Sequence, residues 1–296
     1  MSRLFFFKGV KAQHVKVSHG AFVGLPSLTG LTGLNRHFAI AMAKALQLPV
    51  DSLQPTGALL AFEGYHLHEG YKKGHKAGSA TYEALPAAWA SFTAHIALEV
   101  SPTTAEAAEA LLRSEVPRLA KELLATMSLC KGALREVSGP VNLSRLAEKD
   151  EPERSTVLRL LPANSFVVRD YGMLVADMRD AGLSLMEGLV AAALPHAQRP
   201  GKFREFFERE GADVSLAALA PVMNGYLKIE ETASARSVRQ DAQGNQHNAT
   251  VASPSFTLAR MQKAASVRVA VRDLGEGTWA FWQERKEPFG YFASAA

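Results

Sequence analysis

The stretch from Gly24 to Phe38, G-L-P-S-L-T-G-L-T-G-L-N-R-H-F, joins a turn directly to a helix. Its opening glycine, proline and serine are typical of turns, and the apolar residues that follow recur at nearly helical spacing. The pattern predicts a helix from Leu31 to Leu46, which Pro49 ends. Such a junction places backbone N–H groups and Arg36 near one another, as an anionic ligand would require.

Strands are expected on both sides of this helix. The apolar run Leu4–Phe7 and the alternating stretch Val10–Val17 lie before it, with an interruption near Gly9. Gly57–Phe62 and Ala90–Val100 follow it, and a Gly- and Lys-rich loop at residues 70–78 separates them. This order of strand, helix, strand, loop and strand predicts an α+β fold, built on a ferredoxin-like or RRM-like four-stranded sheet with its helices on one face.

The remaining chain is predicted to alternate between helices and short strands. The expected elements are a helix over 103–132 bent at Pro117, a surface linker at 148–154, two strands within 157–168, helices at 171–193 and 202–210, a strand at 220–230, a turn at 241–245, and strands at 267–271 and 278–282. We divide the chain into the first part of the core at 1–100, a helical insertion and linker at 101–153, and the rest of the core with C-terminal strands at 154–296.

Composition favours a folded chain with one sizeable core or two lobes. Of the 296 residues, 47% are hydrophobic, and no uninterrupted apolar run reaches the roughly 18 residues of a membrane span, so no membrane partner is expected. We interpret the N-terminal residues as a strand and not as a signal peptide. The single cysteine, Cys130, excludes an internal disulfide and zinc sites built on several cysteines, and it suits a cytoplasmic location.

Basic residues are concentrated in two separated blocks. Residues 8–76 contain eight Lys or Arg against three acidic residues, and six of the nine histidines. Residues 232–272 contain six Lys or Arg against Asp241 alone. Two such blocks could converge on one groove that binds phosphate groups, and a solvated face of an ordinary basic protein is the alternative.

Motifs of common catalytic centres are absent from the sequence. It has no G-x-S-x-G, no H-E-x-x-H and no phosphate-binding G-x-x-x-x-G-K-[ST]. His66 and His68 would share one face of a strand, near Glu69 and His75, but no third metal ligand is identified. We therefore expect neither a metal nor a cofactor, and a metal-dependent enzyme that uses His66 and His68 stays an alternative.

An RNA-cleaving site is the sharper enzymatic alternative. A histidine that acts as general acid or base beside a lysine can cleave RNA, although each candidate is also simply a polar residue on a binding face. The candidate histidines are His14, His19, His37 and His75. Trp89, like the other tryptophans and the Phe5–Phe7 run, is predicted to lie in the core, with stacking on bases as the alternative for any that is exposed.

The Gly24–Phe38 stretch resembles a segment, G-[FL]-P-S-x-T-[AG]-[FL]-x-G, near the N-terminus of the CRISPR-associated Cas-five subunit of type I-F, also called the Csy-two protein. Weaker similarities to that family follow in the same order. They lie at His95–Val100, Ala220–Tyr226, and Ser253–Thr257 with Arg260. Together the similar segments span most of the chain.

The resemblance implies a RAMP protein with an RRM-like domain, to which the sequence pattern adds a helical insertion and C-terminal strands. Such a subunit is present in one copy at the foot of an RNA-guided surveillance complex, where it binds the 5′ handle of the crRNA and contacts the Cas-seven backbone subunit. It also pairs with a large Cas-eight subunit, and it is not an enzyme. The RNA-binding candidates are Gly24, Pro26, Ser27, Thr29, Gly33, Arg36 and His37 from the motif, and Lys11, Lys16, Arg236 and Arg260 from the basic blocks.

Two segments depart from the ordinary member of this family, namely the helical stretch at 103–132 and the His- and Lys-rich loop at 65–78. A compact I-F variant lacks the large subunit, and its Cas-five protein carries added helices and recognises the protospacer-adjacent motif of the target double-stranded DNA. If the chain is that variant, the loop contacts DNA. The DNA-binding candidates are Lys72, Lys73, His75 and Lys76.

Overall fold

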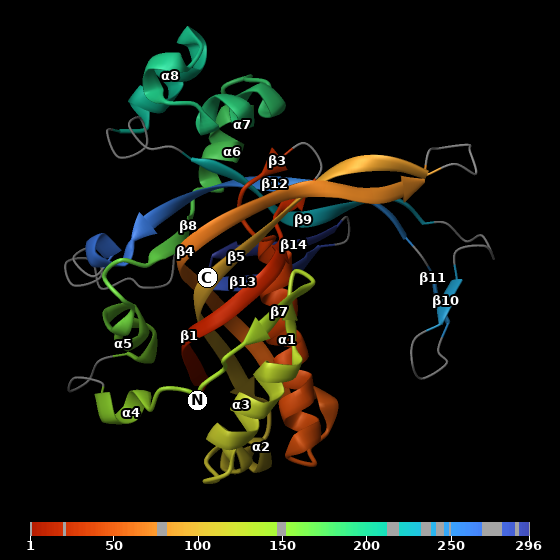
Figure 1. The fold of residues 1–296 in the computed structure, drawn as a ribbon, viewed down its shortest axis with the longest axis vertical. Helices are drawn as coiled ribbons and strands as arrows, with labels where there is room; N and C mark the ends of the chain where they lie inside the picture. Colours follow the sequence, from red (N-terminus) through yellow and green to blue (C-terminus); the bar gives the residue numbers. More distant parts are fainter. Residues whose placement is uncertain are drawn as a thin grey trace.

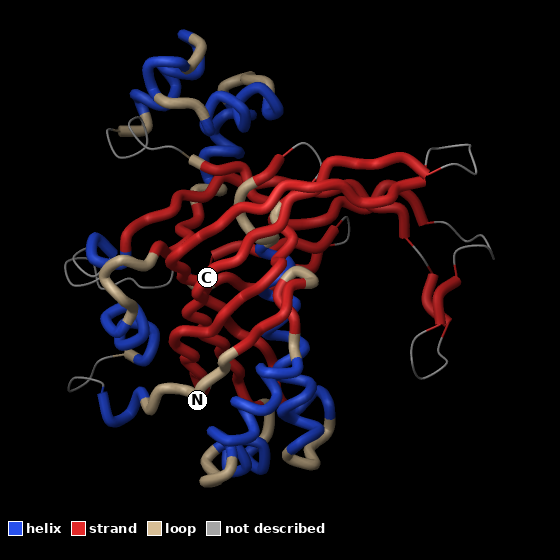
Figure 2. Tube along the Cα trace, viewed as in Figure 1, coloured by secondary structure: helices blue, strands red, loops and turns tan. Residues whose placement is uncertain are grey.

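The computed structural model is a mixed α+β protein built around one large antiparallel sheet, with groups of helices around it (Figures 1 and 2). It describes residues 2–19, 22–75, 82–146, 152–211, 219–231, 238–240, 246–248, 250–267, 280–287 and 290–295. None of the helices in these ranges combines the length and the apolar character that a membrane crossing needs.

The strands are β1 (Arg3–Lys16), β2 (Ser18–His19), β3 (Phe22–Val23), β4 (Leu53–His75), β5 (Tyr82–Pro102), β6 (Ser128–Leu129), β7 (Gly132–Arg135), β8 (Phe166–Asp170), β9 (Ala220–Glu231), β10 (Val238–Gln240), β11 (Gln246–Asn248), β12 (Thr250–Lys263), β13 (Trp282–Glu287) and β14 (Gly290–Ala295). The helices are α1 (Leu28–Ala45), α2 (Ala105–Leu111), α3 (Val116–Thr126), α4 (Leu143–Leu146), α5 (Glu153–Leu160), α6 (Met173–Asp180), α7 (Leu185–Ala193) and α8 (Gly201–Arg209), with 3₁₀ turns η1 (Val50–Ser52) and η2 (His196–Gln198).

The main sheet has the strand order β13-β14-β9-β12-β8-β4-β5-β1-β7-β6. Strand β13 also pairs with β4 through Trp282 and Ala58, so the strands from β13 to β4 form a closed ring. The side chain of Trp282 is buried, and its Nε1 donates to the carbonyl oxygen of Val168 at 3.3 Å. This ring leaves β6 as the remaining edge of the sheet in the described part of the chain.

The first part of the chain forms one compact unit. Its connection from β1 to β4 contains helix α1, and its connection from β5 to β7 contains helices α2 and α3. Strand β1, helix α1, strands β4 and β5, the α2–α3 pair and strand β7 follow one another, and the strands stand in the order β4-β5-β1-β7. Phe38 of α1 is fully buried, with its ring centroid 5.3 Å from that of Phe5 and 6.1 Å from that of Phe7. Apolar residues of α2 and α3 join the same core cluster, so both connections cover one face of these strands.

The opposite face of β1, β4 and β5 is covered at one end only. There Phe6 of β1 packs with Val157 and Leu161, which belong to α5 and its C-terminal end. Farther along β1 the outward positions are taken by Lys8 and Lys11, and both side chains are exposed. The other end of this face is therefore polar and open.

Helices α6, α7 and α8 form a third apolar cluster at the end of the molecule away from α2 and α3 (Figure 1). The predicted helix at 202–210 is confirmed as α8, whose Phe203, Phe206 and Phe207 are buried. The predicted helix at 171–193 is two helices, because Gly182 has φ +69° and ends α6.

The predicted helix at 103–132 is also divided. Thr104 caps α2 by accepting from the backbone N–H of Ala107 at 3.2 Å, as the sequence indicates. Pro117 lies in the first turn of α3, where proline is tolerated. The predicted helical end is wrong, because residues 128–135 form β6 and β7, and β7 pairs with β1. The helical segment therefore joins two strands of the same sheet.

Two other local predictions are wrong. Of the two strands expected within 157–168, the second is confirmed as β8, but the first is helix α5, because Val157, Leu158 and Leu161 place one apolar helical face on the sheet. The loop expected from Gly70 is strand as far as His75, because this segment pairs with the start of β5. Tertiary pairing overrides the low strand propensity of its glycines.

Several predicted elements fall where the structure describes little. The turn at 241–245, and most of the linker at 148–154, lie outside the described residues. So does most of the strand expected at 267–271. Of the strand expected at 278–282, residues 280–282 are described, and β13 begins at Trp282. The division of the chain at residues 100 and 153 stays a prediction.

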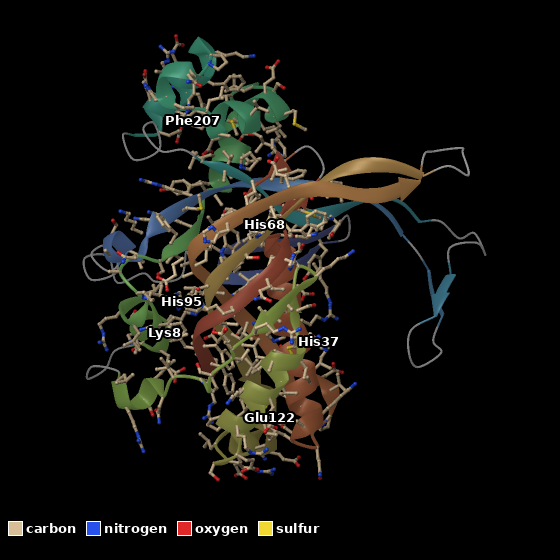
Figure 3. All side chains as sticks on the ribbon, in the orientation of Figure 1. Lys8, His37, His68, His95, Glu122 and Phe207 are labelled. Atoms are coloured by element: carbon tan, nitrogen blue, oxygen red, sulfur yellow. The ribbon has the colours of Figure 1, made fainter. Side chains whose placement is uncertain are left out.

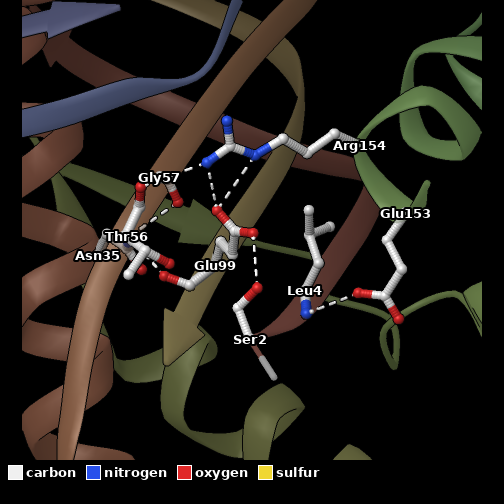
Figure 4. Close-up of polar contacts among 8 residues, drawn as sticks. All are labelled: Ser2, Leu4, Asn35, Thr56, Gly57, Glu99, Glu153 and Arg154. Carbon is white, nitrogen blue, oxygen red and sulfur yellow. Dashed lines mark hydrogen bonds and ion pairs between the residues drawn. The ribbon is translucent and has the colours of Figure 1, made fainter. Parts of the chain in front are cut away.

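A buried polar network fixes α1 and α5 to the central strands (Figure 4). The carboxylate of Glu99 on β5 accepts from Arg154 through Nη2 at 2.6 Å and Nε at 3.2 Å, and from Ser2 Oγ at 3.1 Å. Asn35 of α1 donates to the carbonyl oxygens of Gly57 at 2.8 Å and Glu99 at 3.0 Å. The network thus joins four elements that are far apart in sequence.

Candidate functional site

A pocket of about 370 Å³ lies at the N-terminus of α1, and we call it the α1 pocket. It is lined by Lys16, Ser27, Thr29, Gly30, Cys130, Lys131, Tyr226 and Tyr291. Two of these side chains are cationic, and no acidic residue is among the described residues that line it. The pocket brings Lys16 and the predicted residues Ser27 and Thr29 together, as the sequence indicates.

The first turn of α1 makes this pocket suitable for an anion. The turn contains no acidic residue, and the N-cap Ser27 makes no side-chain capping bond. Instead, Ser27 Oγ lies 2.6 Å from Thr29 Oγ1 and 3.3 Å from the carbonyl oxygen of Met223. The backbone N–H of Gly30 donates to the Ser27 carbonyl at 3.0 Å, so the N–H groups of Leu28 and Thr29 are the ones without a partner within the helix, and the helix dipole adds partial positive charge there. Both features favour a bound phosphate or carboxylate.

The other groups of the pocket add little negative charge. Burial raises the pKa of Cys130 to about 11, with smaller opposing effects from the Ser27 backbone and Lys16, so its thiol stays neutral near pH 7. Burial also raises the pKa of Tyr291, whose hydroxyl lies 3.3 Å from Thr32 Oγ1. The site therefore combines hydroxyl groups, backbone N–H groups and two lysines.

The polar cluster within the Gly24–Phe38 stretch is split over three directions, because consecutive helical residues point to different faces. Asn35 is buried and holds β4 and β5, as described above. Arg36 is half-exposed and its Nη1 lies 3.1 Å from Glu284 Oε1. His37 is exposed on α1, away from His68 on β4 (Figure 3). The prediction that these residues contact one ligand together is not supported by their placement.

The turn residues of the motif are largely buried or hydrogen-bonded within the protein. Pro26 is buried, and Ser27 and Thr29 are nearly so, although both line the pocket. The backbone N–H of Gly24 donates to the carbonyl of Val17 at 3.1 Å, and its carbonyl accepts from the hydroxyl of Tyr65. The turn is therefore anchored from both sides, and it positions the start of α1.

The glycines of α1 provide a matched pair of substitutions. A Cβ on Gly30 would collide with Cys130 Sγ, whereas a Cβ on Gly33 would meet nothing within 4 Å. We expect Gly33→Ala to raise the free energy of unfolding by about 1 kcal/mol, because alanine has the higher helix propensity. We expect Gly30→Ala to lower it, because α1 must move away from the Cys130 loop. Urea unfolding of both variants tests this difference, and equal effects would contradict the packing of Gly30 on Cys130.

A second surface, the polar sheet face, lies on β1, β5 and β4 opposite α1. Residues that face each other on neighbouring strands share one side of the sheet, so their side chains form rows. The rows are Lys11, Thr93 and Glu63; then Ser91 and His66; and then Lys16, Trp89 and His68. Lys11 Nζ lies 3.1 Å from Thr93 Oγ1. Lys16 belongs to the last row and also lines the α1 pocket, so the two surfaces are continuous.

Two bulges shape this face. The pairing of β1 with β5 shifts between Ala12 and Val15, and His14 there has φ +54°, a left-handed conformation that is uncommon for a side chain other than glycine or asparagine. The pairing of β4 with β5 shifts between Glu63 and His66. The imidazole of His14 stacks on that of His68, with ring centroids 6.1 Å apart and planes at 25°. The bulges therefore bring together exposed histidines from different strands.

His95 closes the polar sheet face near Lys8 (Figure 3). Its side chain is almost fully buried, its Nδ1 accepts from the backbone N–H of Gly9 at 3.2 Å, and its Nε2 lies 3.6 Å from Glu63 Oε1. Burial lowers the pKa of His95, Lys8 acts in the same direction, and Glu63 opposes both. The neutral imidazole is therefore the form that the fold stabilises.

This placement predicts a pH effect on stability. The unfolded chain protonates His95 near pH 6.5, whereas the folded chain does so only at lower pH, so stability falls as the pH drops below about 6.5. We expect urea unfolding between about pH 7.5 and about pH 5.5 to show a larger loss for the wild type than for His95→Asn, whose amide oxygen can still accept from Gly9. Equal losses in the two proteins would show that His95 does not carry the effect.

The other predicted site residues lie elsewhere or outside the described side chains. Lys72, Lys73 and His75 belong to β4, but their side chains are not described, and Lys76 and Arg236 lie outside the described residues. Arg260 is on β12, which β8, β4 and β5 separate from β1. Arg260 does not line the α1 pocket. The described residues of the second basic block therefore do not converge on this site.

Some residues of the site were not among the sequence candidates. Lys131 comes to the α1 pocket from the turn between β6 and β7, Tyr226 from β9 and Tyr291 from β14. Tyr226 ends the Ala220–Tyr226 segment of the resemblance but was not chosen as a candidate, and no local motif marks Lys131 or Tyr291. Trp89, predicted in the core, is half-exposed on the polar sheet face. The alternation from Trp89 through Ser91 and Thr93 is the one signal that could have shown a polar strand face. Of the described residues, no three His, Cys, Asp or Glu side chains form a group that could hold a metal ion.

Comparison with known proteins adds no relative to this picture. Neither the scan against protein-family models nor the search of curated proteins finds a match to the chain.

Proposed function

We propose that the chain binds single-stranded RNA through the α1 pocket and the polar sheet face, as a non-catalytic subunit of a type I-F CRISPR surveillance complex in the cytoplasm. In this role it holds the 5′ handle of the crRNA and contacts the Cas-seven backbone subunit. The resemblance of the Gly24–Phe38 stretch supplies the identity of the complex. The geometry around that stretch supplies the argument for RNA.

The strand order supports a ferredoxin-like, RRM-like core of the RAMP type. Helical connections after β1 and after β5, with the order β4-β5-β1-β7, are what a split βαβ unit requires. In such domains the sheet face without helices is available to RNA. Here α4 and α5 cover one end of that face, and the open end carries Lys11, the histidines and Trp89.

The observation that carries the proposal is the continuity of the two surfaces at Lys16. A phosphate in the α1 pocket would meet the first turn of α1, Lys16 and Lys131, and the next nucleotide would lie over the polar sheet face. RNA held in one fixed shape needs backbone donors and cations for its phosphates and planar groups for its bases. Both kinds of group are present on one connected surface.

Co-purification tests this function directly. The chain is expressed with its genomic neighbours, the complex is isolated, and the bound RNA is sequenced. We expect RNA whose 5′ end derives from a CRISPR repeat, together with a backbone subunit. Recovery of the complex without such RNA would refute the proposal. Recovery without a large Cas-eight subunit would favour the compact variant, in which Lys72, Lys73, His75 and Lys76 are proposed to contact target double-stranded DNA.

A metal-independent RNA endonuclease is a second candidate, favoured by the stacked pair of His14 and His68. One neutral imidazole would take the proton of a 2′-hydroxyl, whose oxygen bonds to the adjacent phosphorus. The bond from phosphorus to the 5′ oxygen would break, and the other, protonated imidazole would give that oxygen a proton. The products are a 2′,3′-cyclic phosphate and a 5′-hydroxyl.

If the chain is this enzyme, incubation with repeat RNA and EDTA yields these ends. His14→Ala and His68→Ala would then each slow cleavage by about 100-fold or more, because general acid and base catalysis contribute that much. His37→Ala, on the exposed side of α1, is the matched control. Intact RNA that stays bound to the wild-type protein would reject the enzymatic candidate and leave the binding function in place.

A further inference from the structure

Trp89 is a large aromatic residue outside the core. Among the described residues, the three apolar clusters do not include it. It is half-exposed in a row with Lys16 and His68, and its ring carbon Cζ3 would lie 3.0 Å from a Cβ on Gly70. Its indole therefore covers the backbone of Gly70 on β4. A tryptophan that is only partly buried and lies beside Lys16 and His68 is unusual for a solvated surface and common at binding hot spots.

The surroundings of Trp89 indicate what would cover it. Lys16 lies across from it on β1, and His68 lies across from it on β4. The imidazole of His14, from β1, stacks on that of His68, and Ser91 and Thr93 offer hydroxyl groups along the same strand face. Flat rings beside cations and hydroxyls suit an unpaired nucleobase with its phosphate better than they suit an apolar protein segment.

We propose that Trp89 is the base platform of this site: it stacks on one unpaired base of the bound RNA, next to the nucleotide whose phosphate occupies the α1 pocket. This inference rests on the proposed RNA-binding function and adds its base-contacting residue. Lys16 joins the two contacts, because it pairs across from Trp89 and also lines the pocket. A base inside a duplex cannot stack on the indole, so the platform selects single-stranded RNA.

The test combines protein and RNA substitutions. The RNA recovered with the complex is synthesised with a fluorescein label, as the intact strand and as a series in which each nucleotide in turn lacks its base. Binding to the wild type and to Trp89→Ala is measured by fluorescence anisotropy. Trp89→Phe keeps a planar ring, and Leu67→Ala removes an exposed side chain from the other face of β4. Unfolding curves of all variants confirm that they fold.

We expect Trp89→Ala to weaken binding of the intact strand by about 5- to 150-fold, the usual effect of removing one aromatic platform. We expect Trp89→Phe to weaken it by only about threefold at most and Leu67→Ala to leave it unchanged. Loss of the base at one position should weaken binding to the wild type and have no effect on Trp89→Ala.

Other outcomes overturn the inference in distinguishable ways. If each missing base has the same effect on both proteins, Trp89 does not stack, although RNA binding stands. If Trp89→Ala binds RNA normally but loses a co-purifying protein, the tryptophan is a protein contact. If the wild type binds no RNA, the proposed function itself fails.

Discussion

Glu99→Ala is expected to lower the free energy of unfolding by about 3–5 kcal/mol, the typical cost of removing one partner from a buried ion pair. The Glu99 side chain is 10% exposed and accepts three hydrogen bonds, two from Arg154 and one from Ser2. Its loss leaves the guanidinium, which is 21% exposed, without its counter-charge. It also removes support from the strands that Asn35 ties to α1. Urea unfolding measures the change.

Glu187→Ala is the matched control for this experiment. Glu187 Oε2 lies 2.8 Å from Lys202 Nζ, but both side chains are more than half exposed. Surface pairs of this kind contribute roughly 0–1 kcal/mol, because water and salt screen them. If Glu99→Ala costs no more than Glu187→Ala, the buried network does not stabilise the fold. The double variant Glu99→Ala, Arg154→Ala should recover part of the loss, since the guanidinium is no longer left unpaired.

Neutralising both lysines of the α1 pocket is expected to weaken RNA binding strongly. Lys16→Gln keeps a flexible polar side chain, one atom shorter, without its charge. Lys131→Asn suits the left-handed conformation there, where φ is +70°. We expect the double variant to bind RNA about 10- to 100-fold more weakly near physiological salt, because each lost phosphate contact removes about 0.7 from the slope of log K against log salt. A titration from low to high salt measures both quantities.

Lys44→Gln is the control, because Lys44 is an exposed cation in the last turn of the same helix, far from the pocket. It should leave the salt slope unchanged. If the control and the double variant lose affinity equally, net charge and not the pocket governs binding. If the double variant retains full affinity and slope, the phosphate does not occupy the α1 pocket.

Elements with strong local signals were predicted well from the sequence. The apolar spacing of Leu31, Leu34 and Phe38 predicted α1, which the structure confirms with an earlier start at Leu28. The phenylalanines of 202–210 predicted α8, and the alternation of Val10, Ala12 and Val15 predicted the second half of β1. In each case the spacing of apolar residues within one short segment matches the periodicity with which they are buried in the folded protein.

Elements whose conformation depends on distant partners were predicted poorly. Gly70 and Gly74 indicated a loop, yet pairing with the start of β5 makes residues 70–75 strand. Val157 and its neighbours had strand character, yet they form a helix because their apolar side chains cover the sheet at Phe6. The candidate site shows the same limit. The motif indicated Ser27 and Thr29 as pocket residues. Lys131 lines the same pocket only because the β6–β7 turn lies beside the start of α1.

The sequence by itself determined the α+β class, the turn and helix at Gly24–Phe38, and the positive charge of the N-terminal block. Those properties depend on residue types and on short-range spacing. Only the tertiary structure decided that Asn35 is buried while His37 is exposed, and that Trp89 stands with Lys16 and His68 on an open face. Which side chains meet is set by strand register and helix packing, and register depends on contacts between residues that are far apart along the chain.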